Sequence, residues 1–273
     1  MKILISADME GISGVVDPSH VTSTHPEYQR FRQIMTDDVN AAIRGAFKAG
    51  ADQVVVSDAH GSKTNILVER LDERAELNSG GIAPFGMIQG VDEGVDAAMF
   101  VGYHACMGTQ NAILSHTISG ARVANIWLND RLVGEFGLNA AVCGFFGAPV
   151  LLVSGDLAAC QEAEAWAPGV AQVVVKRATT RHSAQCLPTA RAQRMIETQA
   201  EDAVKSYLQG GAAPLQVAGP VKIVLEFHQA AMADQVRGLP GVVRLDGRRI
   251  EIIAPDMPSG YLTLRAAISM GNA

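Results

Sequence analysis

The sequence has no surplus of basic residues, and this excludes two classes of partner. Its 22 Lys and Arg stand against 28 Asp and Glu, which gives a formal net charge of −6 at pH 7. Nucleic acids and anionic lipid surfaces attract proteins through a positive field, which this composition does not supply. The sequence also lacks an uncharged apolar run of the roughly 18 residues that a membrane-spanning helix needs. We therefore expect no nucleic-acid partner and no membrane partner.

Cysteine is scarce as well, with four residues in 273 and no Cys-x-x-Cys pair. A chain of this length can bury a core without disulfides, so neither a disulfide scaffold nor a thiolate metal site is expected. The N-terminal segment reaches Asp8 and Glu10 before any apolar stretch long enough for a secretory signal. Together these features lead us to expect a protein of the reducing cytoplasm.

What the sequence does contain is an alternation of strand and helix patterns. Residues 2–8 form a short aliphatic run, residues 27–50 place apolar side chains at helical spacing, and residues 52–57 form a second aliphatic run. This is a β-α-β unit, whose two strands should be parallel. Further strands are predicted at 96–101, 148–153 and 172–176, and further helices at 136–146 and 188–208. The sequence therefore predicts an α/β fold, with a mostly parallel sheet and flanking helices.

The C-terminal part of the chain has a different pattern. Gly210-Gly-Ala-Ala-Pro214 is the best candidate for a domain boundary. After it we predict strands at 221–226, 242–245 and 249–253, and helices at 228–236 and from about 260 onward. We therefore expect an α/β catalytic domain at 1–209 and a small α+β domain at 215–273 that docks on it. In the first domain, Asn129-Asp130 suits the tight turn of a hairpin between strands at 123–128 and 131–134.

Acidic and histidine side chains follow several of the predicted strands. They are Asp8, Glu10, His60, His104 and Glu135. Each alone has an ordinary explanation, as a helix cap, a charge in the first turn of a helix, or a hydrogen-bonded histidine. Ligands of parallel α/β sheets bind beyond the carboxyl ends of the strands, and the loops that carry these five residues converge there. The joint pattern predicts a metal site.

The chemistry of these donors narrows the choice of metal. Imidazole and carboxylate ligands without cysteine favour Zn²⁺, with Mn²⁺ or Co²⁺ as other candidates. One catalytic zinc needs about three protein ligands, so five ligands suit two ions that share a carboxylate and a water. His116, between Ser115 and Thr117, is a candidate general acid, general base or nucleophile, or an ordinary loop histidine. We rank direct attack by His116 below attack by a metal-activated water.

Other polar residues near the predicted site receive weaker assignments. Asp58 is either an orienting partner of His60 or, more simply, a cap of the loop after its strand. Cys106 is not expected to be a nucleophile, because a reactive thiol needs a neighbouring base or positive charge and the nearby His104 is better used as a metal ligand. The segment 10–14 lacks the Lys-Ser/Thr ending of a phosphate-binding loop. The remaining histidines are treated as ordinary: His20, His25, His182 and His228.

These residues resemble a known family. Ser6-x-Asp8-x-Glu10-Gly11 is similar to the signature of the D-aminopeptidases of the DppA type, the M55 metallopeptidases. Four further segments are similar to blocks of that family and occur in the same order: 57–61, 102–105, 115–117 and 134–140. The resemblance covers about half of the chain, from Lys2 to Ala140.

The resemblance implies a two-zinc aminopeptidase that acts on short peptides and amides with a D-residue at the N-terminus. It implies metal ligation by the same five residues, with Asp8 as the bridging ligand and His116 as the catalytic residue. It also implies a homodecamer of two stacked five-membered rings. Three other interpretations stay open on residues alone: a two-metal hydrolase of another class, a non-catalytic metal-binding assembly protein, and a metal-free binding module. A phosphoesterase would need basic side chains near the site, for which Arg122 and Arg131 are the candidates.

Overall fold

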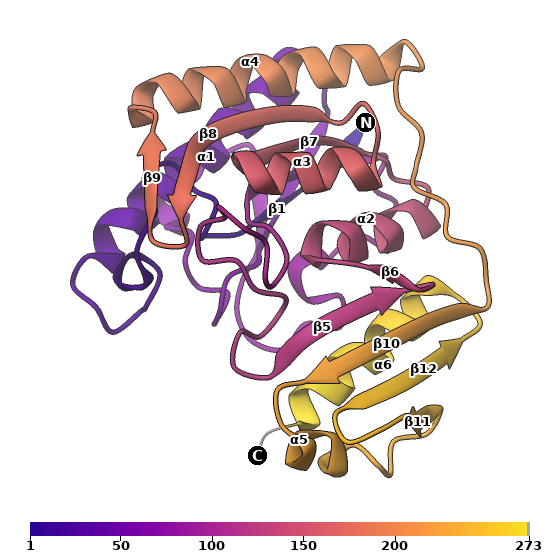
Figure 1. Cartoon of the computed structure of the whole chain (residues 1–273). Helices are drawn as coiled ribbons and strands as arrows, with labels where there is room; N and C mark the ends of the chain where they lie inside the picture. The colour runs from indigo at the N-terminus through magenta and orange to yellow at the C-terminus, as the bar shows by residue number, and fades with distance from the viewer. Residues whose placement is uncertain (272–273) are drawn as a thin grey trace.

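A mostly parallel sheet of seven strands forms the larger part of the molecule in the computed structural model, which describes residues 1–271 (Figure 1). Its strand order is β3-β2-β1-β4-β7-β8-β9, and β9 runs antiparallel to β8. In chain order the strands are β1 Lys2–Ala7, β2 Gln53–Asp58, β3 Ala75–Asn78, β4 Ala97–Tyr103, β7 Val150–Asp156, β8 Ala171–Thr180 and β9 Ser183–Cys186. The predicted fold class, a mostly parallel α/β sheet with flanking helices, is confirmed.

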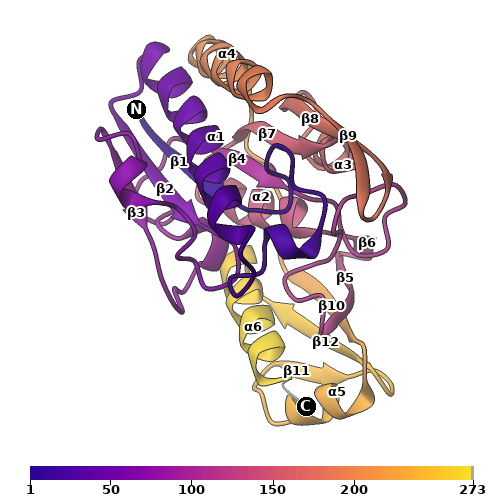
Figure 2. The ribbon, with the colours of Figure 1, turned by 90° about the vertical axis from the view of Figure 1, so that its left-hand side faces the viewer.

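Helices cover both faces of this sheet. One face packs against α1 (Tyr28–Lys48) and α4 (Thr189–Leu208), which lie side by side (Figure 2). The other face packs against α2 (Glu135–Phe145) and α3 (Leu157–Trp166). Successive side chains of a strand point to opposite faces, so Ile3 and Ile5 of β1 join the first core and Leu4 joins the second. Near-continuous aliphatic strands in the sequence reflect this double burial.

The close packing of α1 on α4 depends on one small residue. A Cβ added at Gly45 would lie 2.3 Å from the carbonyl oxygen of Glu197. Any other residue would therefore push the two helices apart. Arg44 and Lys48, on the same helix, pair with the Glu197 carboxylate across this contact.

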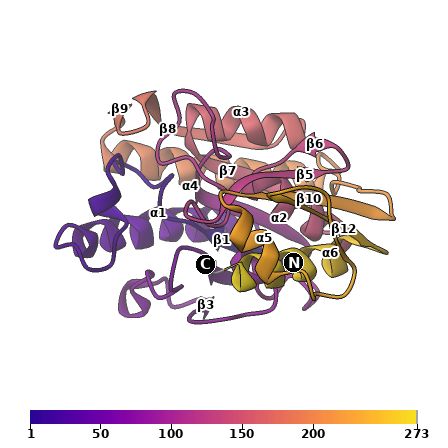
Figure 3. The ribbon, with the colours of Figure 1, turned by 60° about the horizontal axis from the view of Figure 1, so that its bottom comes forward.

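A second sheet, antiparallel and of five strands, occupies the other end of the molecule (Figure 1) and comes forward in Figure 3. Its order is β11-β12-β10-β5-β6. The strands are β5 Val123–Leu128, β6 Arg131–Leu132, β10 Val221–Phe227, β11 Val242–Arg244 and β12 Arg249–Ala254. Helix α6 (Met257–Met270) packs on β10 and β12, and α5 (Ala230–Gln235) follows β10. Residues of β10 alternate between buried and partly exposed, as expected for a sheet with one covered face.

The hairpin predicted at 123–134 is confirmed, but it belongs to this second sheet. Asn129 and Asp130 have φ values of 47° and 67°, the left-handed conformation that a tight hairpin turn requires. β5 pairs with β10, which lies on the C-terminal side of the predicted domain boundary. The sheet of the small C-terminal part is therefore completed by two strands from residues 123–132. The division into domains at 1–209 and 215–273 stays a prediction.

Three regular elements were not predicted from sequence: β3, α3 and β9. β3 is a four-residue edge strand and β9 is short and polar, so neither carries a clear apolar period. α3 begins directly after β7, where the Asp156 carboxylate accepts a hydrogen bond from the Ala159 amide. Three short 3₁₀ helices are also present: Pro18–His20, Val68–Arg70 and Gly86–Ile88. Within the described residues, none of the helices has both the length and the apolar composition needed to cross a bilayer.

Candidate metal centre

Neighbouring strands bring the predicted ligands to one edge of the large sheet. Asp8 and Glu10 follow β1, His60 follows β2, and His104 follows β4. These three strands are adjacent and parallel, so their carboxyl ends lie together. Glu135 arrives from another direction, as the first residue of α2. Residues up to 127 positions apart in the sequence therefore lie in one cluster, since Asp8 and Glu135 both contact His104.

A glycine shapes the loop that carries Asp8 and Glu10. The Gly11 amide donates a hydrogen bond to the Gly102 carbonyl at 2.7 Å. A Cβ at Gly11 would lie 2.0 Å from the Tyr103 carbonyl oxygen, so the backbones can approach this closely only with glycine. The sequence Glu10-Gly11 is therefore explained by close passage of this loop over the end of β4.

The two oxygens of Asp8 face two different imidazoles. Oδ1 lies 3.5 Å from Nδ1 of His60, and Oδ2 lies 3.3 Å from Nε2 of His104. His60 Nδ1 is also 3.0 Å from Oε2 of Glu10, and His104 Nε2 is 3.5 Å from Oε2 of Glu135. Four of the five residues in these contacts are buried, and His60 is partly buried. Asp8 therefore lies between two groups of donors, one with Glu10 and His60 and one with His104 and Glu135.

Backbone carbonyls orient the imidazoles. His60 Nε2 lies 2.9 Å from the Val21 carbonyl, and His104 Nδ1 lies 3.0 Å from the Ala105 carbonyl. A ring nitrogen that contacts a carbonyl carries the proton, which leaves the lone pair on the nitrogen that faces the carboxylates. Two lone-pair donors, an imidazole nitrogen and a carboxylate oxygen, repel each other unless a cation lies between them.

The electrostatics of the cluster show the same need for positive charge. Burial lowers the pKa of His104, but the carboxylates of Glu135 and Asp8 outweigh it and raise that pKa well above its ordinary value. The pKa of His60 is raised in the same way, with burial opposed by Glu10 and Asp8. Burial alone would raise the pKa of Asp8, but the imidazoles of His104 and His60 outweigh it, so the pKa lies below its ordinary value. The arrangement favours ionised carboxylates beside a positive centre.

The donor set fits a metal on direct geometric grounds. Asp8 Oδ2 and His104 Nε2 are buried and have no hydrogen-bond partner. Unpaired buried polar atoms are costly, so a partner for them is expected. Two triplets of donor atoms lie within 4.8 Å of one another: Asp8, Glu10 and His104, and His104, His116 and Glu135. The residues present can therefore hold divalent cations.

A buried lysine and a buried aspartate hold the loop that carries the acids. Lys176 of β8 is 1% exposed, and its Nζ donates hydrogen bonds to the carbonyls of Glu10, Ile12 and Val15, at 2.6–2.8 Å. Asp38 of α1 accepts a hydrogen bond from the Ser13 amide at 3.0 Å. Neither residue was singled out from sequence, because nothing in the local pattern around 38 or 176 indicates contact with residues 10–15.

His116 lies beside the cluster and is less buried than the other candidates. Its ring stacks on that of His104, with centroids 4.1 Å apart, and its Nε2 lies 3.8 Å from Oε1 of Glu135. Its Nδ1 contacts the Leu114 carbonyl at 3.0 Å. The turn between β8 and β9 supports this loop, because the Arg181 guanidinium donates to the carbonyl and hydroxyl of Ser115.

The other residues considered from sequence lie in structural roles. Asp58 accepts hydrogen bonds from the amides of Asn65 and Ile66, as a cap of its loop, while His60 is oriented by Val21 instead. Burial and then Glu162 raise the pKa of Cys106, which argues against a thiolate nucleophile. Among the described residues, the four cysteines are free.

A pocket with a volume of about 290 Å³ opens onto the cluster. Asp8, His60, His116 and Glu135 line it together with two cations that the sequence analysis did not select, Lys63 and Arg265. Arg122 and Arg131, which it did consider, do not line this pocket. Arg131 stacks on Trp166 instead, 3.8 Å from the ring centroid. The proximity of Lys63 to His60 in sequence was an available signal, whereas nothing near Arg265 indicated its position.

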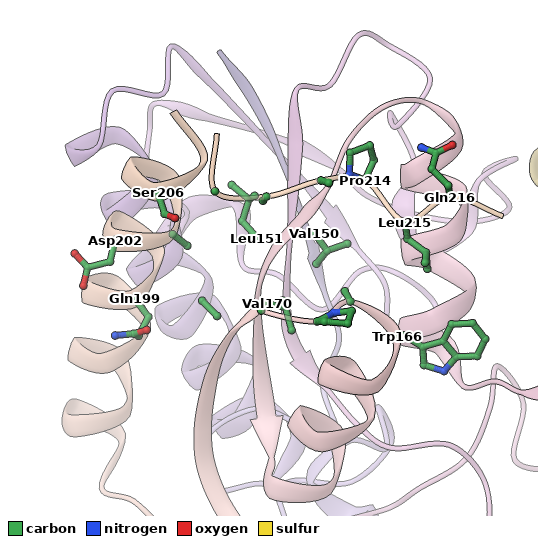
Figure 4. A pocket seen from close by; sticks show the side chains of 18 residues that line it. Val150, Leu151, Trp166, Val170, Gln199, Asp202, Ser206, Pro214, Leu215 and Gln216 are labelled. Atoms are coloured by element: carbon green, nitrogen blue, oxygen red, sulfur yellow. The ribbon is translucent and has the colours of Figure 1, made fainter. Parts of the chain in front are cut away.

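A larger pocket, of about 520 Å³, lies away from the cluster between α4 and the segment 211–216 (Figure 4). Trp166, Val150 and Leu151 line it, and Asp202 is its one titratable lining residue within the part of the chain described. It brings no imidazole, thiol or paired carboxylates together. Size alone therefore does not identify the reactive site of this molecule.

Comparisons with known proteins show which family this chain resembles. The family Peptidase_M55, described as D-aminopeptidase, matches residues 1–266. A D-aminopeptidase of Bacillus subtilis (strain 168) is 36% identical over 262 residues, which cover 96% of this chain and 94% of that protein. A solved structure described as the Zn-dependent D-aminopeptidase DppA from Bacillus subtilis, a self-compartmentalizing protease, superposes with a TM-score of 0.94 at 35% identity. That superposition covers 99% of this chain and 98% of the other.

Proposed function

Since the chain belongs to the D-aminopeptidase family Peptidase_M55, we propose that it is a zinc-dependent enzyme that removes the N-terminal residue of short D-amino-acid peptides and amides. The observation that carries this proposal is the buried cluster of Asp8, His60, His104 and Glu135, which opens into a pocket and contains unpaired donor atoms. The relative of known structure is described as Zn-dependent, which supports zinc as the metal here.

We further propose that this site would hold two zinc ions and that Asp8 would serve as a ligand to both. Support comes from the two oxygens of this carboxylate, which face His60 and His104 separately. Glu10 and His60 would complete the ligands of one ion, and His104 and Glu135 those of the other. Mn²⁺ or Co²⁺ would also suit this donor set.

The residues around the pocket would have different roles in peptide hydrolysis. Bound zinc supplies Lewis acidity, which polarises a carbonyl and lowers the pKa of water. His116 lines the pocket, and its Nε2 is not engaged by a backbone carbonyl, so it can move a proton to the departing amine. Glu135 contacts both His104 and His116 and positions the two rings relative to each other.

Metal content and stereochemical preference test the proposal together. Inductively coupled plasma analysis of freshly purified protein should give two zinc ions per chain. In a panel of D- and L-aminoacyl amides, the enzyme should hydrolyse the D-aminoacyl amides. Hydrolysis of the L-amides alone would contradict the D preference, and metal without hydrolysis of any amide would favour a non-catalytic metal-binding protein.

The quaternary structure is also a proposal: a homodecamer of two five-membered rings that encloses the active sites. The relative's description as a self-compartmentalizing protease supports this assembly. Exposed apolar side chains on the second sheet, Val243, Leu245 and Ile253, are further support, because they are 45–55% exposed in the single chain. Light scattering should give ten times the 28.8 kDa of one chain, and a monomer would contradict the proposal.

We propose the cytoplasm as the cellular location. The free cysteines support a reducing compartment. Cell fractionation followed by immunodetection would test this, and recovery with secreted proteins would contradict it.

A further inference from the structure

Two cationic side chains line the same pocket as the carboxylate cluster. Lys63 lies in the loop after β2, and Arg265 lies on α6, near the far end of the chain. They are close enough for Arg265 to lower the pKa of Lys63. Like charges that converge on one cavity are unfavourable unless an anion shares it. The lining of this pocket therefore combines carboxylates with two cations.

Lys63 has no partner of its own in the described structure. Its side chain is 9% exposed, its Nζ makes no hydrogen bond, and no carboxylate lies within ion-pair distance among residues 1–271. Asp58 is the nearest acid to influence it, but the Asp58 carboxylate is already engaged by Asn65 and Ile66. Burial first, and then Arg265, lower the pKa of Lys63 to about 8, so the side chain is still mostly protonated near pH 7.

Arg265 is held in place rather than free to seek an anion. Its guanidinium donates hydrogen bonds to the carbonyls of Ala83 and Pro84 and lies over the ring of Tyr261. These contacts fix a positive charge at the pocket wall. Lys63, with a longer flexible stem and no partner, is the side chain that can move toward a bound group.

We propose that Lys63, with Arg265 behind it, binds the C-terminal carboxylate of the substrate, and that the enzyme therefore prefers short peptides with a free C-terminus. This inference rests on the proposed function. A peptide whose N-terminal amine lies at the carboxylate cluster also carries a carboxylate that needs a cation, and Lys63 and Arg265 are the Lys and Arg side chains that line this pocket. The volume of about 290 Å³ suits a peptide of two or three residues rather than a long chain.

The kinetic test compares D-alanyl-D-alanine with its C-terminal amide. The wild-type enzyme should have the higher kcat/KM for the free acid. Lys63→Met should lower kcat/KM for the acid by about 10–100-fold, mainly through KM, because a charge-assisted hydrogen bond of about 1.5–3 kcal/mol is lost. The same variant should lower kcat/KM for the amide far less than for the acid. Lys63→Arg should restore part of the preference, and Lys205→Met, at an exposed lysine of α4, is the matched control.

A binding measurement separates this inference from the proposed function. The probes are reduced-bond analogues of the same dipeptide and its amide, in which CH₂ replaces the scissile carbonyl, titrated calorimetrically into the zinc-loaded enzyme. Tighter binding of the acid that disappears in Lys63→Met supports the carboxylate site, even if the wild type hydrolyses neither peptide and the proposed function fails. Equal binding of both analogues, or an equal loss for both in Lys63→Met, would overturn the carboxylate site.

Discussion

At the residue scale, the site is explained by polar atoms that have no partner within the protein. Asp8 Oδ2 and His104 Nε2 are buried, unpaired and face each other at 3.3 Å. The residues that could be predicted from sequence are those directly after a strand, because position at a strand end fixes where the side chain lies. Lys63, Lys176 and Arg265 could not be predicted in this way, because their roles depend on which distant backbone or side chain folds against them.

Replacement of His116 tests its role in proton transfer. We expect His116→Ala to retain both zinc ions and to lose about 10²–10⁴-fold in kcat, the usual contribution of a general acid or base. Metal analysis and steady-state kinetics on the same preparation measure the two effects. Full metal content with an undiminished rate would remove His116 from the mechanism.

Lys176 is predicted to position the metal-binding loop. Lys176→Met would leave the carbonyls of Glu10, Ile12 and Val15 without their buried donor. We expect the free energy of unfolding to fall by about 3–5 kcal/mol, together with weaker zinc retention under a chelator. Urea unfolding and a chelator competition assay measure these losses. An unaltered zinc affinity in a folded variant would show that the loop does not need this lysine.

Asp38 should make stability depend on pH. Burial raises the pKa of Asp38 to about 6, although hydrogen bonds from Ser13 oppose it. Between about pH 4 and pH 6 the folded state therefore holds a proton that the unfolded state has released, so stability from this group falls as pH rises. Asp38→Asn keeps an acceptor for the Ser13 amide and removes the free-energy cost of ionising a buried carboxyl group. Its stability relative to wild type should improve by roughly 2 kcal/mol from pH 4 to pH 7.

Urea unfolding of both proteins at the two pH values measures this difference, because groups common to both cancel. Asp37→Asn, the neighbouring partly exposed aspartate that pairs with Arg70, is the matched control. A difference between Asp38→Asn and wild type that does not change with pH would mean that Asp38 is as well solvated in the folded state as in the unfolded state.

At the scale of elements, β1, β2, β4 and α1 could be predicted because each carries a strong apolar period and is buried. β9 could not, because it is a short polar strand whose position depends on pairing with β8. Yet this hairpin matters to the site, since its turn carries Arg181, which holds Ser115 next to His116. An element with a weak sequence signal can thus support the loop that carries His116.

We expect Arg181→Ala to lower kcat by about tenfold, equivalent to about 1.4 kcal/mol, because the His116 loop loses its charge-assisted support. Zinc content should not change, since Arg181 does not contact the five predicted ligands. Kinetics and metal analysis measure these two quantities, and Arg181→Lys should recover part of the rate. A loss of zinc in parallel with kcat would instead indicate general damage to the site.

At the scale of the whole molecule, two sheets share one chain in an order that the sequence only partly indicated. The segment 210–214 marks a change of pattern, but the second sheet also takes β5 and β6 from residues before it. Pairing between distant strands leaves no local trace, so the hairpin at 123–134 was predicted but the sheet to which it belongs was not. One consequence concerns the candidate site, because α6 of the C-terminal part places Arg265 in the lining of the same pocket as the carboxylate cluster.

The central claim is that the cluster around Asp8 holds two metal ions. Anomalous diffraction from crystals of the zinc-loaded protein, collected on both sides of the zinc absorption edge, tests it most directly. The account predicts two zinc peaks per chain, one on each side of the Asp8 carboxylate, with His60 beside one and His104 beside the other. Zinc peaks elsewhere in the molecule, or no peak next to Asp8, would contradict it.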